Sequence, residues 1–182
     1  MIQDMQFPDD ETILDLMITD SSRNEGFRLF VNKYKERLYY MIRRMVDSHE
    51  DADDIIQNTF LKIIKNIHTF NGQSALFTWV YRIATNECLN FLGSKHNKLK
   101  SISLESIAET VETSQPVDGD RVAASLHEAV QLLPEKQKMI FNLRYFEALA
   151  YAEISEITGT SVGALKASYH HAVKKIEEQL TR

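Results

Sequence analysis

Hydrophobic residues along this chain recur at intervals of three and four, the spacing of one face of an α-helix. The first strong stripe covers Phe27–Met45 and has basic side chains on its opposite face. A second stripe covers Ala52–Ile64, after a Ser48 that can cap a helix together with Asp51. A short acidic segment ahead of both favours a further helix near Glu11–Thr19. The pattern therefore predicts helices over this part of the chain.

A polar break at Phe70–Ser74 separates the second stripe from a third. Its Asn71-Gly72 pair is typical of a turn. Such a pair can also connect a β-hairpin, but the flanking residues lack the alternation of strands. From about Ala75 to Gly93 the apolar positions return to helical spacing. We therefore expect a helical bundle in the first half.

Residues 94–120 break the helical pattern. A basic run passes into a stretch rich in Ser, Thr and acidic residues that also holds Pro116 and Gly119. This composition is typical of a flexible linker. We expect one domain over residues 1–98, an acidic linker over 99–120 and a second domain over 121–182.

The second half is again helical in pattern, with helices predicted at Val122–Leu133, Glu135–Phe146 and Tyr151–Thr158. Gly159-Thr160 then forms a tight turn, and Ser161 caps a final helix that ends at Leu180. A short helix, a glycine turn and a longer helix make a helix-turn-helix arrangement. The positions predicted to face the core are Ile140, Leu143, Phe146, Ile154, Ile157, Val162, Leu165, Tyr169, Ala172, Val173, Ile176 and Leu180.

The predicted fold is thus all-α, an N-terminal helical bundle linked to a C-terminal helix-turn-helix domain. The chain has 182 residues, of which 43% are hydrophobic and 26% charged, as in ordinary globular proteins. Cys88 is the only cysteine, which excludes an internal disulfide and favours a reducing compartment; its place in the pattern favours simple core packing. The acidic N-terminus is unlike a signal peptide, and no apolar run has the length of a membrane span. We expect a cytoplasmic protein without membrane insertion.

The net charge of −5 is unevenly distributed. The segment 101–120 is acidic and contains no Lys or Arg, so the rest of the chain is close to neutral. Residues 47–54 form an acidic block, and residues 62–100 form a basic one in which Glu87 is the only acid. Each block alone could be a solvated helix face. Two adjacent blocks of opposite sign indicate two different partners.

The sequence lacks the residue patterns that are typical of catalytic and metal-binding sites. The sequence shows no paired carboxylates in a cleft pattern, no Cys/His ligand set and no glycine-rich phosphate loop. The neighbouring His170 and His171 diverge around a helix, which disfavours shared ligation of one ion. We predict no catalytic residues, no metal, no cofactor and no enzymatic activity.

Three segments in order carry a resemblance to a known family: DADDIIQNTFLKIIKNI, FNGQSALFTWVYRIATN and LLPEKQKMIFNLRYFEALAYAEISEITGTSVGALKASYHHAVKKIEEQL. The chain resembles the extracytoplasmic-function (ECF) sigma factors of the sigma-70 family over most of residues 27–180. The resemblance implies the region 2 and region 4 domains of that family and leaves no room for a separate domain between them. It implies binding to RNA polymerase core enzyme and to promoter DNA, with an anti-sigma factor as a candidate further partner.

By this resemblance, the helix that matches Asp51–Ile64 binds the core enzyme. Acidic side chains there can pair with a basic partner and also repel DNA. The alternative is a solvated helix N-terminus whose acids the helix dipole favours. The predicted core-binding residues are the polar Asp51, Asp54, Gln57 and Asn58 and the apolar Ile55 and Phe60.

The loop and the helix after it match the segment that opens the minus-ten element. Recognition of single strands needs stacking surfaces, exposed backbone and polar groups that read base edges. For Trp79, core packing is an equally open alternative. The predicted minus-ten residues are Phe70, Asn71, Gly72, Gln73 and Ser74 in the loop, and Trp79, Arg82, Asn86 and Asn90 on the helix.

The final helix matches the one that reads the minus-thirty-five duplex in the major groove. Many family members have arginine at Ser168 and His171 and a Thr-Val pair at Ala164-Leu165. This departure predicts a different promoter element. The predicted minus-thirty-five residues are Ser161, Lys166, Ser168, His170, His171 and Lys174.

Two other functions compete with a sigma factor. A helix-turn-helix regulator that acts without polymerase would bind specific DNA tightly by itself. A small helical enzyme or cofactor-binding protein lacks any supporting motif in the sequence.

Overall fold

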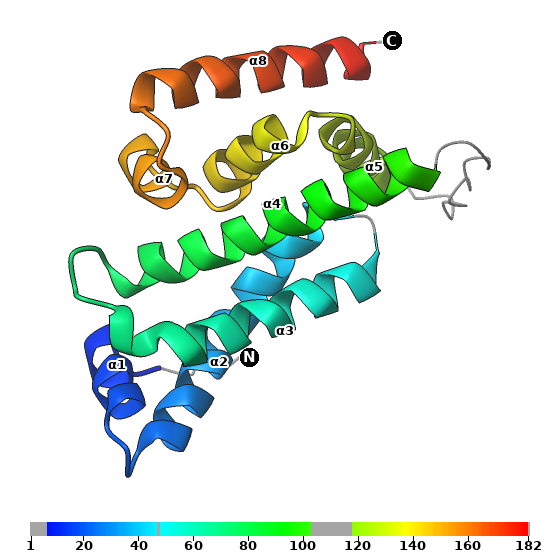
Figure 1. The fold of residues 1–182 in the computed structure, drawn as a ribbon. Coiled ribbons are helices and arrows are strands. Elements are labelled where there is room, and N and C mark those ends of the chain that lie inside the picture. The colour runs from blue at the N-terminus through cyan, green and yellow to red at the C-terminus, as the bar shows by residue number, and fades with distance from the viewer. Residues whose placement is uncertain (1–6, 47, 103–117, 182) are drawn as a thin grey trace. The chain divides into compact units, whose positions relative to one another are not determined.

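The computed structural model describes residues 7–46, 48–102 and 118–181, and every regular element in these ranges is helical (Figure 1). The chain divides into two compact units, residues 1–88 with 156–159 and residues 89–155 with 160–182, so the boundary falls within the helix that contains Cys88 and Leu89. No helix among the described residues is both long enough and apolar enough to span a membrane. The predicted all-α class is confirmed.

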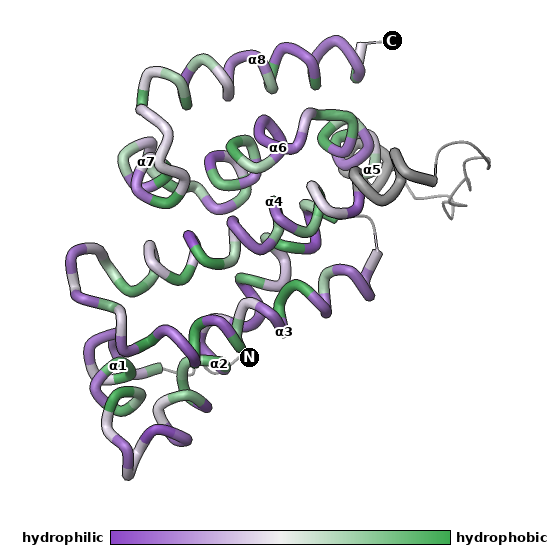
Figure 2. The backbone as a smooth tube through the Cα atoms, in the orientation of Figure 1, coloured by the Kyte–Doolittle hydropathy of each residue, from purple (hydrophilic) through white to green (hydrophobic). Residues whose placement is uncertain are grey.

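The first unit is built from the N-terminal helices. Figure 2 shows hydrophobic and hydrophilic residues alternating around α2 and α3, as amphipathic helices require. The elements are α1 (Asp10–Ile18), α2 (Arg23–Arg43), α3 (His49–Asn66), the 3-10 turn η1 (Ile67–Thr69) and α4 (Leu76–Ile102).

Caps and turns in this unit follow the predicted chemistry. The Ser48 hydroxyl accepts a hydrogen bond from Asp51 N at 3.0 Å, so it caps α3 as expected. Gly72 has a φ of 70°, the left-handed conformation that favours glycine in a turn.

The core of the first unit joins the apolar faces of α1–α4. Phe30, Leu38 and Ile63 are fully buried, as are Val80, Ala84 and Cys88 on α4. One predicted core residue is wrong: Ile64 is 40% exposed. It lies one position beyond the buried Ile63, and a helix that buries residue 63 turns residue 64 by about a third of a turn toward solvent.

The second unit holds the helix-turn-helix. Ala129, Val130, Leu133, Phe141, Ala172 and Ile176 form its core, and Leu126, Tyr169 and Val173 cover this cluster in part. Gly159 has a φ of 68° in the predicted turn before the last helix. The elements are α5 (Asp118–Gln131), α6 (Glu135–Phe141), the π turn η2 (Asn142–Phe146), α7 (Tyr151–Thr158) and α8 (Val162–Leu180).

The α4 helix is longer than the sequence pattern predicts. It continues through Gly93 to Ile102, where a linker was expected to begin, and α5 starts at Asp118, inside the predicted linker. The basic run after Gly93 contains Lys and Leu, which favour helix, and no proline to end it. Residues 103–117 of the predicted acidic linker lie outside the described part of the chain.

The π turn changes which residues of the second unit face inward. Glu147 N donates to Asn142 O at 3.1 Å, a bond across five residues. The wider turn shifts the helical phase, so Phe146 is 37% exposed where an unbroken α-helix predicts burial. Val162 and Leu180 were also predicted inward and are exposed; they are the first and last residues of α8.

Candidate functional site

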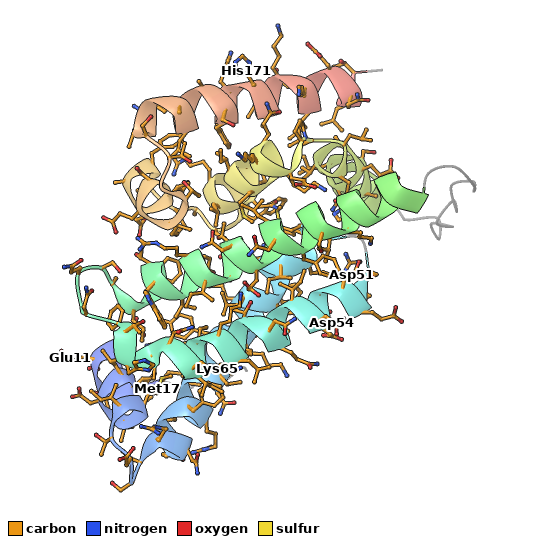
Figure 3. The ribbon with its side chains drawn as sticks, viewed as in Figure 1. Glu11, Met17, Asp51, Asp54, Lys65 and His171 are labelled. Atoms are coloured by element: carbon orange, nitrogen blue, oxygen red, sulfur yellow. The ribbon has the colours of Figure 1, made fainter. Side chains whose placement is uncertain are left out.

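Glu50, Asp53 and Asp54 of the acidic block are exposed in the first turns of α3. Asp54, Gln57 and Asn58 are exposed, and Asp51 is half-buried near the Ser48 cap. Figure 3 labels Asp51 and Asp54 along this helix. The predicted polar residues therefore share one accessible surface.

The apolar part of that surface differs from the prediction. Ile55 is only 2% exposed and belongs to the core of its own unit, so its side chain cannot contact a partner in this conformation. Phe60 is half-buried, and its ring lies edge-on to Phe27 and Phe30, with centroids 6.4 and 6.2 Å away.

Two apolar residues that the sequence reasoning assigned to other roles or omitted lie on the exposed face instead. Leu61 is 51% exposed and Ile64 40%. Leu61 lies three residues after Asn58, and Ile64 lies three residues after Leu61, so continuing the stripe at helical spacing could have located both. We name the exposed face formed by Asp54, Gln57, Asn58, Leu61 and Ile64 the α3 face.

The loop after η1 presents small and amide side chains to solvent. Asn71, Gly72 and Gln73 are exposed, and Ser74 is half-buried. Gln73 N donates to Asn71 Oδ1 at 3.2 Å, so this amide oxygen shapes the turn. A Cβ at residue 72 would meet nothing within 4 Å. Glycine is therefore favoured here because of the positive φ, and no other atom fills the space where a side chain would lie.

Trp79 connects the loop to α4. Its side chain is half-buried, and its ring centroid lies 5.6 Å from that of Phe70. Trp79 thus has a packing contact inside the unit and also an accessible surface. Packing against Phe70 therefore occupies part of this side chain, and its contact with DNA stays a prediction.

A polar strip continues along α4 from Trp79. Arg82, Asn86 and Asn90 are exposed and follow one another at intervals of four, after an initial interval of three. Residues so spaced lie on one helical face. Together the loop and this strip expose one cation and several amides.

The α8 helix presents a polar face away from its buried residues. Lys166, His170, His171 and Lys174 are exposed, whereas Ser168 is half-buried. Figure 3 labels His171 on this helix. The His170 and His171 rings lie 6.1 Å apart by their centroids.

Two of these candidate residues, Ser161 and Lys166, also make contacts that support the fold. The Ser161 hydroxyl accepts from Ala164 N at 3.4 Å, which makes it the cap of α8. The Lys166 ammonium lies 5.9 Å above the Tyr151 ring, a contact that holds the first turns of α8 near α7.

A surface that the sequence pattern did not indicate lies between α5 and α8. It is an open groove of about 190 Å³ lined by Ser125, Glu128, Ala129, Leu132, Gln179 and Leu180. Leu132, which follows the last residue of α5, is 69% exposed. Core-directed periodicity misses it because it faces outward.

A helix-turn-helix unit joined to a second helical unit is an arrangement found in many DNA-binding proteins. Comparison with protein families gives two matches: sigma-70 region 2 at residues 30–97 and sigma-70 region 4 at residues 123–176. The chain belongs to the sigma-70 family and is a sigma factor of the extracytoplasmic-function type.

Individual relatives agree with this family. The chain is similar to the RNA polymerase sigma-H factor of Pseudomonas aeruginosa, 27% identical over 85% of this chain and 86% of the relative. It is also similar to the ECF RNA polymerase sigma-E factor of Escherichia coli K12, 28% identical over 86% of this chain and 87% of the relative. Proteins of this family are transcription factors rather than enzymes, and they bind RNA polymerase and promoter DNA.

Solved structures show the same fold. The sigma factor RpoE from Bartonella quintana, solved with the anti-sigma factor NepR, has a TM-score of 0.69 and 19% identity, covering 86% of this chain and 98% of that one. CnrH, solved with the cytosolic domain of CnrY, has a TM-score of 0.69 and 16% identity, covering 94% of this chain and 97% of that one.

Proposed function

We propose that this sigma factor directs promoter-specific initiation through three separate surfaces and acts in the cytoplasm. The α3 face binds core polymerase, the loop with the α4 strip holds the melted minus-ten strand, and α8 reads the minus-thirty-five duplex. The main support for the proposal is a change in the kind of exposed side chains within the first unit. An exposed acidic face on α3 is followed in the chain by an exposed amide and cation surface on the loop and α4.

Core binding is supported by the composition of the α3 face. Asp54 offers charge to a basic partner, while Leu61 and Ile64 offer apolar area in place of the buried Ile55. Charged groups chiefly steer association and fix orientation, and apolar groups near the centre of an interface supply much of its affinity.

Binding of melted bases is supported by the loop. An unpaired base needs an aromatic face to stack on and polar groups along its edge. The half-buried Trp79 presents such a face beside the exposed Asn71 and Gln73. Arg82 adds a cation that suits a backbone phosphate.

Duplex reading is assigned to α8, whose exposed Lys166, His170, His171 and Lys174 follow the glycine turn. The half-buried Ser168 and the capping Ser161 contribute at the edge of this face. Because this face has lysines and histidines but no arginine, it lacks the arginine contact with guanine, and we expect it to read a different element from the one that arginines would read.

An anti-sigma factor is proposed as a further partner. The sigma factor RpoE of Bartonella quintana is solved with an anti-sigma factor, and CnrH is solved with the cytosolic domain of CnrY. A regulator that covers the α3 face would prevent core binding, and the open groove between α5 and α8 offers such a regulator a second surface.

The test is transcription reconstituted from core polymerase and this protein on a promoter library. Promoters with shared elements at both positions are expected only when both proteins are present. A gel shift with and without core separates this function from a polymerase-independent regulator, which would bind specific DNA tightly by itself. Strong specific binding without core would overturn the proposal.

The assignment of the α3 face is tested by reversing one charge. Asp54→Lys is expected to weaken core binding at low salt, with a smaller effect at high salt, because exposed charges are screened. Glu36→Lys is the matched control, since Glu36 is an exposed acid on α2 outside this face. Equal weakening by both variants would point to net charge instead of the α3 face.

A further inference from the structure

The N-terminal helix α1 precedes the segment that matches sigma-70 region 2. It nevertheless belongs to the core of the first unit, since Ile13 and Met17 are buried. It contacts α2 and the short η1 turn. The second contact is notable because η1 ends where the minus-ten loop begins.

The α1 helix is fixed to α2 by directional contacts at its start. The Asp10 carboxylate forms an ion pair with Lys33 Nζ at 2.8 Å and accepts a hydrogen bond from Tyr34 Oη at 2.7 Å. Lys33 Nζ also donates to Pro8 O at 2.8 Å. Burial and the Asp10 carboxylate raise the pKa of Tyr34 well above its usual range, so the hydroxyl remains a donor at neutral pH.

The end of α1 is fixed by close approach. A Cβ at Gly26 would lie 2.5 Å from Met17 N and 2.6 Å from Leu16 C, so only glycine lets α2 come this near. The Ser22 hydroxyl donates to Leu16 O at 3.1 Å across the connection between the two helices. Both ends of α1 are therefore held in register with α2.

The path from α1 to the loop is short. Ile67 of η1 is buried, and its carbonyl accepts a hydrogen bond from Phe70 N at 3.1 Å. The Phe70 ring then contacts Trp79. The start of the loop is thus held by η1 on one side and by α4 on the other, and α1 is one of the elements that contact η1.

We propose that α1 is a brace that positions the minus-ten loop through η1, Phe70 and Trp79. This inference rests on the proposed role of the loop in holding the melted strand. A loop that captures an extruded base must be held in place by supporting contacts, because a small displacement separates the stacking face from the polar groups. In this proposal Gly26 and Asp10 are positioning residues, remote from DNA.

Two variants of the full-length chain release α1 in different ways. Gly26→Ala forces α1 away from α2, and Asp10→Ala removes both the ion pair and the Tyr34 hydrogen bond. Gly93→Ala is the matched control, because a Cβ at this helical glycine meets nothing within 4 Å. Circular dichroism first establishes that each variant folds; if Gly26→Ala does not, Asp10→Ala decides the result.

Three measurements follow: Trp79 emission, affinity for core polymerase, and affinity for a single-stranded oligonucleotide. The oligonucleotide carries the minus-ten strand of a promoter selected with the wild-type holoenzyme, and binding is measured in the holoenzyme. Trp79 is the only tryptophan, so its emission reports directly on the Phe70 contact.

We expect both variants to shift Trp79 emission and to weaken oligonucleotide binding about tenfold, roughly the factor that loss of one base stack gives. Core affinity should stay within about twofold, and Gly93→Ala should match the wild type. Unchanged emission and oligonucleotide binding in the folded variants would overturn the brace, as would a parallel loss of core affinity. Failure of the wild-type holoenzyme to bind the oligonucleotide would instead overturn the proposed function.

Discussion

The rings of Phe70 and Trp79 lie 5.6 Å apart at an interplanar angle of 59°. They join the first residue of the loop to the first turn of α4. A tilted aromatic pair contributes about 0.5–1.5 kcal/mol beyond its buried area. The pair can therefore order the loop while one part of the Trp79 side chain remains accessible.

Replacement of Trp79 separates its two roles. Trp79→Ala should weaken binding of the minus-ten oligonucleotide about tenfold, because a stacked base is worth about 1–3 kcal/mol. Trp79→Phe should retain most of that affinity, since phenylalanine keeps an aromatic face and a contact with Phe70. Fluorescence anisotropy of a labelled oligonucleotide measures both variants in the holoenzyme.

Core affinity is the control for Trp79, and we expect it to be equal in the two variants and the wild type. Equal loss of oligonucleotide binding by Trp79→Phe and Trp79→Ala would contradict a stacking role. A fall in melting temperature that parallels the binding loss would assign Trp79 to the core alone.

The sequence predicted the helices well where one local rule decides the structure. Ser48 and Ser161 cap their helices, and Gly72 and Gly159 have the positive φ that their turns require. The buried Leu165, Ala172 and Ile176 follow the spacing of a regular helix. These features depend on a few neighbouring residues, so a single sequence is enough to find them.

The sequence-based predictions were wrong where several weak structural preferences compete. Gly93 is only a mild helix breaker, and nothing local ends α4 before Ile102. The π turn that exposes Phe146 leaves no mark on the hydrophobic spacing. Among the candidate site residues, Ile55 was assigned to a partner although its spacing equally fits the core. An amphipathic pattern identifies the two faces of a helix, but whether an apolar residue at their border is covered depends on neighbouring helices.

Cys88 is expected to be inert in the native chain. Burial raises the pKa of its thiol to about 12, so the reactive thiolate is rare at neutral pH. A thiol reagent at about pH 8 should label the native chain far more slowly than the chain unfolded in urea. Rapid labelling of the native chain would show that the α4 face opens readily.

The raised pKa of Cys88 also predicts how the free energy of unfolding changes at alkaline pH. In the unfolded chain the thiol ionises near its ordinary pKa of about 8.5, while in the folded chain it stays protonated to about pH 12. The unfolded state therefore binds fewer protons above about pH 9, and the contribution of Cys88 to stability falls as pH rises. Cys88→Ala should lose this component of the pH dependence, measured by urea titration.

Lys174 is proposed to neutralise a phosphate of the minus-thirty-five duplex. Lys174→Ala should weaken holoenzyme binding to a selected promoter without changing the preferred sequence. It should also reduce the slope of log affinity against log salt by about one, the effect of losing one phosphate contact. Lys136→Ala, which removes an exposed lysine on α6, is the control and should leave the slope unchanged. An altered promoter preference would assign Lys174 to base reading.

Ala148 has a φ of 55°, and it is the only residue other than glycine with a positive φ in the described part of the chain. This conformation costs an L-residue roughly 1–2 kcal/mol, because its Cβ approaches the following carbonyl. Ala148→Gly should therefore raise the free energy of unfolding by about 0.5–1 kcal/mol, after the larger backbone entropy of unfolded glycine is subtracted. Ala167→Gly, at an exposed position within α8, should lower it by about 1 kcal/mol. Urea titration measures the free energy of unfolding of both Ala→Gly variants, one in the left-handed conformation and one in a helix. Equal destabilisation of the two would show that the turn at Ala148 stores no strain.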